Sequence, residues 1–357
     1  MKILMLVNWK IEYTNEIPMD RQPPDYYVEG KPYWFFKYFQ NSAELQVDVV
    51  DIRSFPWLER FEQNKLRFYI WQSLKCIPRL HKYDLILSHG MQSGIVLCLY
   101  RRIFGKGNYK HIVFDIGAFN SGREDGRALK LMQFASKSLD GVIYHTSVQE
   151  EYYRKCHPWL MDRAEFIMFG TDYNYFKKRN KAGDIREKKA YILCVGYNKR
   201  DWDTLIKAYN GISTDMHLRL IGNGDIKAEN PNVEIFDKVN ITELKEQIEN
   251  SYFCVLPLKS FNYSYGQMTL LQQMAMGKAV IAADVPSIRA YTKENALLLY
   301  EPENVRMLGE RMQELVDNPE TCLKMGKMAE KAVKDLYNEK NMALEIERVI
   351  HRIVEGK

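Results

Sequence analysis

Short apolar runs alternate with longer segments of helical periodicity along most of the 357-residue chain. Several runs, such as YILCVG at 191–196, are apolar at every position, which is typical of parallel strands covered by helices on both faces. In the first half we expect strands at 2–7, 45–52, 84–90, 111–117, 141–146 and 164–170. In the second half we expect strands at 191–196, 218–222, 233–236, 253–258, 279–284 and 296–300. The pattern predicts an α/β protein with two doubly wound parallel sheets.

A charged segment without apolar periodicity, KKRNKAGDIREKK at 177–189, separates the two halves and is predicted to be a hinge. We expect an N-terminal Rossmann-like domain over 1–178, a linker over 179–189 and a C-terminal Rossmann-like domain over 190–335. The last residues, 336–357, are predicted to form a helix that packs back toward the N-terminal domain. The two domains would face each other across a cleft at the carboxyl ends of their strands, where such sheets bind ligands.

The composition limits the cellular compartments in which the protein can be expected. The chain is 46% hydrophobic, but none of its apolar stretches is long enough to span a bilayer. The N-terminal MKILMLV lacks the length and the cleavage site of a secretory signal. None of the six cysteines has CxxC spacing, and Cys98, Cys194 and Cys254 lie in apolar runs, where cysteine acts as a small hydrophobic residue. We therefore expect a soluble, cytoplasmic protein.

Positive charge is concentrated between Arg53 and Lys110, where eleven Lys and Arg residues face three acids. Aromatic residues are interspersed among these charges: Phe55, Trp57, Phe61, Phe68, Tyr69 and Trp71. One interpretation is a solvated helical face whose aromatic side chains pack inward. The other is a surface that contacts anionic lipid headgroups, for example on the inner face of the plasma membrane. No nucleic-acid-binding motif accompanies the charge, so nucleic acid is not an expected partner.

Polar residues are concentrated at one predicted helix start, within YSYGQMTLLQQMAMGKAVIAAD. The helix is expected to begin near Gln267 or Met268. A helix N-terminus presents unpaired N–H groups and partial positive charge, which suit a phosphate or diphosphate. Gly266 would let the backbone approach an anion closely, and Thr269 would add a hydroxyl. The alternative is a simple cap with a turn glycine.

Two other strand ends in the second half favour an anion site. Lys199 and Arg200 follow the first strand of that half, where two adjacent cations would neutralise a diphosphate. LIGNGD at 220–225 ends the next strand with Gly222 and Gly224, which would allow a nucleotide to approach closely. Three such features at strand ends of one domain predict a shared site there.

These segments, taken in order, resemble the glycosyltransferase family 4 group of retaining, GT-B-fold sugar transferases. The matching segments are YDLILSHG, LDGVIYHTSVQEEYYRK, FIMFGTDYNYF, ILCVGYNKRDWDTLIKAY, LIGNGD and LLQQMAMGKAVIAADVPSIR. The last of them is the most specific, and together they extend through most of the chain. The resemblance implies the GT-B fold, two Rossmann-like domains that face a central cleft.

The resemblance also implies chemistry. A nucleotide-diphosphate sugar would bind mainly to the second domain and a glycan or lipid-linked acceptor mainly to the first, with retention at the anomeric carbon and without a metal or cofactor. His89 would lie beside the donor sugar or the acceptor hydroxyl. Asp115 faces the same cleft by topology, and a helix cap is its alternative role. The implied donor-binding residues are Lys199, Arg200, Gly222, Gly224, Ser264, Tyr265, Gly266, Gln267, Met268, Thr269 and Gln272.

The sequence departs from the family pattern at two glutamates that are usually eight residues apart. The second, which commonly contacts the ribose, falls on Gln272, and the first falls on Ser264 or, if the loop shifts, on Gln267. A glutamine still binds a hydroxyl, but without charge assistance the hydrogen bond is about half as strong. These changes leave open a catalytically silent GT-B protein that acts as a binding or partner subunit. A sugar-nucleotide epimerase or a phosphorylase are further alternatives.

A second departure follows the first strand, where the usual glycine pair is missing. The segment NWKIEYTNEIPMDRQPPDYYVEGKPYWFF stands there instead. It carries six aromatic residues, which would form a lid or an acceptor platform: Tyr26, Tyr27, Tyr33, Trp34, Phe35 and Phe36. We expect about half of them to lie in the core.

Overall fold

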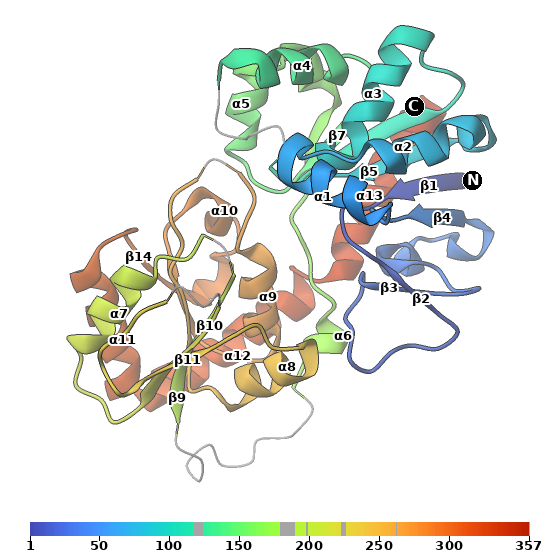
Figure 1. The fold of residues 1–357 in the computed structure, drawn as a ribbon. Helices are drawn as coiled ribbons and strands as arrows, with labels where there is room; N and C mark the ends of the chain where they lie inside the picture. The colour runs from blue at the N-terminus through green and yellow to red at the C-terminus, as the bar shows by residue number, and fades with distance from the viewer. Residues whose placement is uncertain (118–123, 179–189, 198, 223–225, 262, 357) are drawn as a thin grey trace.

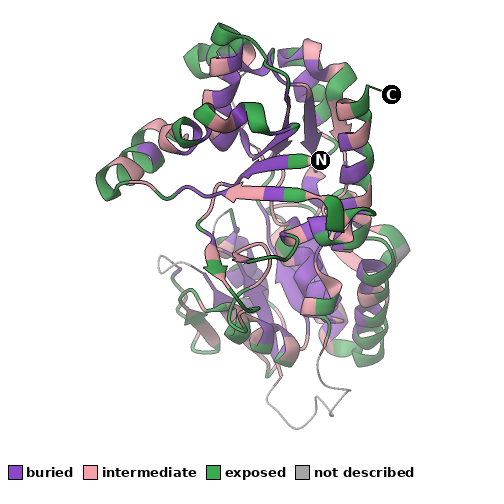
Figure 2. Cartoon of the chain, turned by 90° about the vertical axis from the view of Figure 1, so that its right-hand side faces the viewer, coloured by how far each residue is buried: buried purple, intermediate pink, exposed green. Residues whose placement is uncertain are grey.

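The computed structural model describes residues 1–117, 124–178, 190–197, 199–222, 226–261 and 263–356. Its N-terminal domain is built on a six-stranded parallel sheet in the order β4-β1-β5-β6-β7-β8. The strands are β1 (Lys2–Leu6), β4 (Gln46–Val50), β5 (Leu85–His89), β6 (Lys110–Asp115), β7 (Gly141–Tyr144) and β8 (Ala164–Phe166). The central strands β1, β5, β6 and β7 are buried along almost their whole length, whereas the edge strands β4 and β8 are only partly buried (Figure 2).

The C-terminal domain has a second six-stranded parallel sheet, in the order β11-β10-β9-β12-β13-β14. Its strands are β9 (Tyr191–Val195), β10 (His217–Ile221), β11 (Val233–Phe236), β12 (Cys254–Leu256), β13 (Val280–Ala283) and β14 (Leu297–Tyr300). All twelve predicted strands and the two-sheet α/β class are thus confirmed. The observed strands are slightly shorter, because polar turns begin before the apolar run ends; β6, for example, stops where the Asp115 carboxylate accepts a hydrogen bond from the Gly117 N–H.

Helices cover both sheets (Figure 1). In the first half they are α1 (Pro56–Phe61), α2 (Ile70–Cys76), α3 (Met91–Phe104), α4 (Gly126–Ser136), α5 (Gln149–Cys156) and α6 (Tyr173–Phe176). In the second half they are α7 (Trp202–Asn210), α8 (Ile241–Asn250), α9 (Gln267–Ala275), α10 (Pro286–Arg289), α11 (Val305–Asp317), α12 (Pro319–Asp335) and α13 (Glu339–Glu355). Side-chain caps define several starts, such as the capping box of Asn240 with Glu243 at α8.

The last helix, α13, returns to the N-terminal domain, where the chain ends (Figure 1). Its apolar face enters the core beneath β1 and β5 through Met342, Ala343, Ile346, Val349 and Ile350. Its polar face carries Arg348 and Arg352, which both pair with Glu165 in β8. The predicted linker over 179–189 lies outside the described residues.

The segment between β1 and β4 contains an element that the apolar pattern did not predict. β2 (Glu12–Thr14) and β3 (Tyr26–Val28) form a small parallel sheet. Of the six aromatic residues expected here as lid or core, three are buried (Tyr33, Phe35 and Phe36) and three are half-buried (Tyr26, Tyr27 and Trp34). The expectation that about half of them belong to the core is confirmed.

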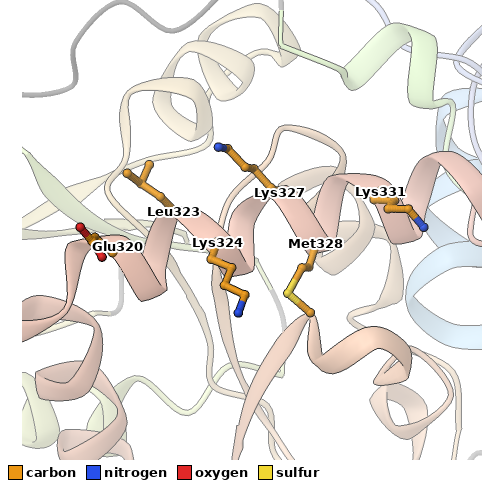
Figure 3. A pocket seen from close by; sticks show the side chains of 6 residues that line it. All are labelled: Glu320, Leu323, Lys324, Lys327, Met328 and Lys331. Atoms are coloured by element: carbon orange, nitrogen blue, oxygen red, sulfur yellow. The ribbon is translucent and has the colours of Figure 1, made fainter.

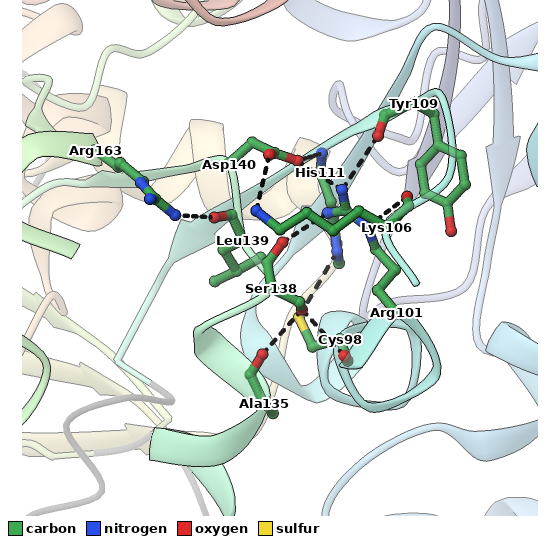
Figure 4. Close-up of polar contacts among 10 residues, drawn as sticks. All are labelled: Cys98, Arg101, Lys106, Tyr109, His111, Ala135, Ser138, Leu139, Asp140 and Arg163. Atoms are coloured by element: carbon green, nitrogen blue, oxygen red, sulfur yellow. Dashed lines mark hydrogen bonds and ion pairs between the residues drawn. The ribbon is translucent and has the colours of Figure 1, made fainter. Parts of the chain in front are cut away.

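The basic stretch 53–110 divides into buried and exposed parts. Arg101 is buried, and its guanidinium pairs with Asp140 at 2.8 Å and donates to the Ser138 carbonyl at 2.9 Å (Figure 4). Because Asp140 also accepts from the His111 N–H, this network ties the end of α3 to β6 and to the turn before β7. Arg101 therefore serves the core and is not part of a binding surface.

The aromatic residues of the same stretch do not share one environment. Phe68, Tyr69 and Trp71 are half-buried, in agreement with inward packing. Inward packing is wrong for Phe55, Trp57 and Phe61, whose exposed fractions are 53%, 69% and 47%. They lie on or just before α1, which is attached to the carboxyl end of β1 by the ion pair of Lys10 with Glu59 at 2.5 Å.

No helix in the described part of the chain is long and apolar enough to cross a membrane. All six cysteines are buried and unpaired, as expected of reduced core residues.

Candidate active site

The carboxyl ends of the two sheets face each other, and side chains of the two domains contact each other at this junction, which we call the cleft. Thr146, just after β7, lies 2.7 Å from Ser264 through their hydroxyl oxygens. Gln267, at the start of α9, donates from Nε2 to Thr146 Oγ1 at 3.0 Å and to the His145 carbonyl at 3.3 Å. Gln267 Nε2 is also 3.0 Å from Ser264 Oγ, so the two residues predicted as alternatives for the first glutamate occupy one cluster.

Helix α9 begins at Gln267, one of the two predicted starting points, and Gly266 is its N-cap. Gly266 has φ +83°, and a Cβ there would lie 2.7 Å from Leu258, so only glycine fits without strain. No side chain of the described residues caps this helix. Its first turn therefore keeps backbone N–H groups and partial positive charge directed toward the cleft. Met268 is 48% exposed there.

Arg200 reaches from the end of β9 to this helix start. Its Nε donates to the Val195 carbonyl at 2.9 Å, and its Nη2 donates to Thr269 Oγ1 at 3.2 Å. The guanidinium lies over Gly196, where a Cβ would be 2.2 Å from Nε. Burial lowers the pKa of Arg200, but a guanidinium remains charged in proteins. The structure thus brings together Arg200 and Thr269, two of the predicted donor-binding residues.

The side chain of Lys199, the residue before Arg200, contacts aromatic rings and not Thr269. Its backbone is in the left-handed region at φ +61°, and its exposed ammonium lies 3.8 Å from the Phe261 ring centroid and 5.1 Å from that of Tyr263. Tyr265 packs edge-on against Phe261, and burial raises the pKa of its phenol. Phe261 and Tyr263 were not among the predicted site residues; the alternation of aromatic and polar residues in FNYSY was the available signal.

The predicted glycine pair is only partly described. Gly222 allows the end of β10 to approach its neighbours, because a Cβ there would lie 2.8 Å from Trp202 and 2.9 Å from the Gly196 carbonyl oxygen. Gly224 lies outside the described residues, so its predicted nucleotide contact remains a prediction.

His89 ends β5 on the N-terminal side of the cleft. Its Nδ1 is 3.3 Å from Asn8 Oδ1, and its ring centroid is 4.6 Å from Trp9 and 5.8 Å from Trp34. Burial and the neighbouring His145 lower the pKa of His89 to about 3. The imidazole is therefore neutral at physiological pH, so it can donate or accept a hydrogen bond but not supply a positive charge. Trp9 was not among the predicted site residues.

Asp115 ends β6 and is fully buried. Its carboxylate accepts hydrogen bonds from the Gly117 N–H at 2.8 Å, from Gln149 Nε2 at 2.9 Å and from the Tyr153 hydroxyl. These contacts fix the turn after β6 against α5, which is a structural role. A catalytic role for Asp115 remains a prediction.

Gln272 faces the first domain from the second turn of α9. Its buried side chain donates from Nε2 to Gln22 Oε1 at 3.1 Å, and Gln22 comes from the segment between β2 and β3. That segment therefore covers α9 at the position where the family usually carries its second glutamate. No motif pointed to Gln22.

The chain also has a surface hollow of about 420 Å³, which lies on the outer face of α12. Figure 3 shows that one helix provides its lining, which includes Leu323 and three lysines. A ligand site usually has polar groups that converge from several elements, and this hollow has none. It is not a candidate active site.

Comparison with known proteins identifies the kind of fold. Residues 189–318 match the family described as Glycosyl transferases group 1. Sucrose-phosphate synthase from Thermosynechococcus elongatus has a TM-score of 0.73 at 17% identity and covers 100% of both chains. HepE from Anabaena, solved with UDP, has a TM-score of 0.69 at 13% identity over 98% of this chain and 99% of HepE. Comparison with curated proteins gives no match.

A glycosyltransferase from Rickettsia africae is also similar, with a TM-score of 0.66 at 12% identity over 98% of this chain and 100% of its own. These structures show that the chain has the GT-B fold, and the match over 189–318 agrees with it. The predicted resemblance to GT-B glycosyltransferases is thereby confirmed. Assignment to family 4 and retention of configuration remain predictions.

Proposed function

We propose that this chain, whose residues 189–318 match the group 1 glycosyltransferases, transfers a sugar from a nucleotide-diphosphate sugar to a glycan or lipid-linked acceptor. The observation that carries the proposal is the contact of Arg200 with Thr269 at the uncapped start of α9. Helix N–H groups, a hydroxyl and a buried cation are the partners that a diphosphate requires.

In this proposal the acceptor hydroxyl oxygen replaces the diphosphate oxygen at the anomeric carbon, with retention of configuration. Negative charge then grows on the departing diphosphate. Arg200 and the first N–H groups of α9 would stabilise that charge, and the hydrogen bonds of Arg200 to Val195 and Thr269 support this role because they hold its guanidinium at the helix start. We expect the reaction to proceed without a metal ion and the donor to carry UDP, the nucleotide bound by the similar HepE structure.

The polar contacts between the domains support a closed active state. The contacts of Gln267 with Thr146 and of Gln272 with Gln22 both join α9 to the N-terminal domain. A donor bound at the start of α9 would thus lie in a cleft that excludes bulk water, which limits hydrolysis of the donor.

We further propose that the protein binds the surface of an anionic membrane, where a lipid-linked acceptor would be found. The α1 segment (residues 55–67) exposes Phe55, Trp57 and Phe61 next to the exposed basic residues Arg60, Lys65 and Arg67. Exposed aromatic rings beside cations suit the interface of a membrane that carries negative headgroups. The ion pair of Lys10 with Glu59 keeps this segment close to the cleft.

A second candidate function is a silent GT-B subunit that binds a sugar nucleotide without transferring sugar. The observation that favours it is that Ser264, Gln267 and Gln272 bond to the other domain through neutral groups where carboxylates are usual in the family. A bound sugar nucleotide would then hold the two domains together without sugar transfer.

Donor turnover in the Arg200→Ala variant tests the leading proposal. UDP release from UDP-glucose would be measured with and without saccharide acceptors, and product analysis would separate transfer from epimerisation. We expect Arg200→Ala to lower turnover at least about a hundredfold, as removal of a charge-stabilising donor does in other enzymes. The control Arg306→Ala removes an exposed arginine of α11 and should retain turnover; EDTA should leave the wild-type rate unchanged.

Near-normal turnover of Arg200→Ala would refute the assignment of the diphosphate site. If the wild-type protein binds UDP but releases none from UDP-glucose under any condition, the silent-subunit alternative is favoured. Thermal denaturation of each variant, with and without UDP, would separate lost chemistry from lost folding.

A further inference from the structure

The N-terminal sheet has a topological switch point at the cleft. In the order β4-β1-β5-β6-β7-β8, the connections leave β1 and β5 toward opposite edges of the sheet. Open α/β sheets bind ligands in the crevice outside the carboxyl ends of such a strand pair. Asn8 and Trp9 follow β1 there, and His89 ends β5.

Trp9 and His89 form an aromatic corner with Trp34, which lies in the segment between β1 and β4. The indoles of Trp9 and Trp34 have centroids 5.9 Å apart at an interplanar angle of 83°, and both lie next to the His89 ring. Asn8, Trp9, Trp34 and His89 are all half-buried, so each retains accessible surface. We call these four residues the tryptophan corner.

The orientation of both indoles is fixed by hydrogen bonds. Trp34 Nε1 donates to Glu339 Oε2 at 2.9 Å, and Glu339, at the start of α13, is only 3% exposed and pairs with Lys37. Trp9 Nε1 donates to the Pro24 carbonyl at 3.3 Å. Since an indole has one donor, each ring presents only its apolar faces and edges to a ligand.

The backbone conformation of Trp34 is a further sign that the surrounding structure holds the tryptophan corner in one arrangement. Trp34 has φ +47°, a region that bulky residues rarely adopt. Such a conformation persists only where its surroundings enforce it, and it is found most often at functional sites.

We propose that the tryptophan corner binds a saccharide ring of the acceptor, with the apolar face of the ring on the indoles and its hydroxyls near Asn8 and His89. The inference rests on the proposed function because it assigns the acceptor side of the same cleft. All four side chains are neutral, since the pKa of His89 is lowered to about 3. A phosphate group would find no charged partner among them, whereas a sugar presents C–H faces and hydroxyls that match this mixture.

Saccharide binding to purified protein in the presence of UDP tests the inference. The probes are glucose, galactose, N-acetylglucosamine, maltose and cellobiose, each titrated by calorimetry with the wild type, Trp9→Leu, Trp9→Phe and Trp159→Leu. We expect Trp9→Leu to raise the dissociation constant of the bound saccharide about tenfold, and Trp9→Phe to change it less because an aromatic face remains. Trp159, half-buried near α4 and distant from the cleft, provides the matched control and should leave saccharide binding unchanged.

UDP binding, measured separately by thermal shift, distinguishes the possible failures. If UDP stabilises the wild type but none of the five saccharides binds, or if Trp9→Leu binds saccharide as well as the wild type, the inference is overturned and the proposed donor site is not. If UDP does not bind at all, the proposed function itself fails. A Trp9→Leu protein that still shows the UDP shift is folded, so its loss of saccharide affinity would be assigned to the corner.

Discussion

At the scale of single residues, Lys199 and Arg200 show how adjacent cations acquire different roles. The left-handed backbone at Lys199 turns its side chain toward Phe261, while Arg200 extends along β9 to Thr269. The sequence predicted two adjacent cations at this strand end, and both residues follow β9 in the structure, while their binding of a diphosphate stays a prediction. It could not predict which of the two faces α9, because that depends on one φ angle. Contacts such as Gln22 with Gln272 were also beyond prediction, since they join residues 250 positions apart.

Buried histidines predict a loss of stability in mild acid. Burial lowers the pKa of His111 to about 3 and those of His145 and His157 to about 4, below the ordinary value of 6.5. The unfolded chain therefore binds more protons below pH 6.5, so stability is complete above that pH and falls as the pH decreases toward 4. Each histidine should contribute a slope of about 1.4 kcal/mol per pH unit between pH 6 and 5.

Urea unfolding at pH 7.0, 6.0 and 5.0 measures this slope. His111→Gln removes one titrating group, so its curve should be flatter than that of the wild type even if its stability at pH 7 is lower. His81→Gln, at an exposed histidine, is the control for the substitution itself. A free energy of unfolding that does not change from pH 7 to 5 would contradict the prediction.

At the scale of elements, apolar continuity was a sufficient signal for the central strands of the two large sheets, which are buried on both faces, although edge strands such as β4 and β11 also carry polar, partly exposed residues. It failed for β2 and β3, which are three residues long, polar or half-buried, and paired only with each other. Their position depends on packing of the segment against the core through Tyr33, Phe35 and Phe36. The start of α9 was predictable within one residue because glycine at a helix start is a local signal.

The N-cap of α9 gives a prediction with a close control. Gly266→Ala would place a methyl group at φ +83° and 2.7 Å from Leu258, so we expect it to lower the free energy of unfolding by about 2–4 kcal/mol and to weaken UDP binding. Gly30 has φ +73° but no atom within 4 Å of its Cβ position. Gly30→Ala therefore tests strain alone and should cost about 1 kcal/mol.

Urea unfolding and UDP thermal shifts of both variants provide the measurement. Equal losses of stability in the two variants would show that the Leu258 side chain moves without cost. The close contact of Gly266 with Leu258, just after β12, would then not be the reason that glycine is required.

At the scale of the whole molecule, each sheet has its switch point at the same cleft. In the C-terminal sheet it lies between β9 and β12, where Arg200 forms a bridge with Leu258; in the N-terminal sheet it lies between β1 and β5. Helix α13 then joins the two halves by entering the N-terminal core, and Phe169 N–H donates to the Tyr291 hydroxyl at the same junction. In the proposed function, two sheets with facing switch points would hold the donor and the acceptor next to each other, which is what group transfer requires.

The proposed membrane binding would involve the outer surface of the molecule, and the α1 segment makes it testable. Wild-type protein should float with vesicles that contain phosphatidylglycerol at low salt and should be released in part at high salt, because the basic residues contribute through screened charge. Trp57→Ser removes a side chain that is 69% exposed and should reduce flotation strongly. Leu323→Ser is the matched control, since Leu323 is 54% exposed among three lysines on α12, on the other domain. Equal flotation of the wild type and Trp57→Ser would exclude the α1 segment as the membrane contact, and an equal loss in both variants would show that binding is not specific to that segment.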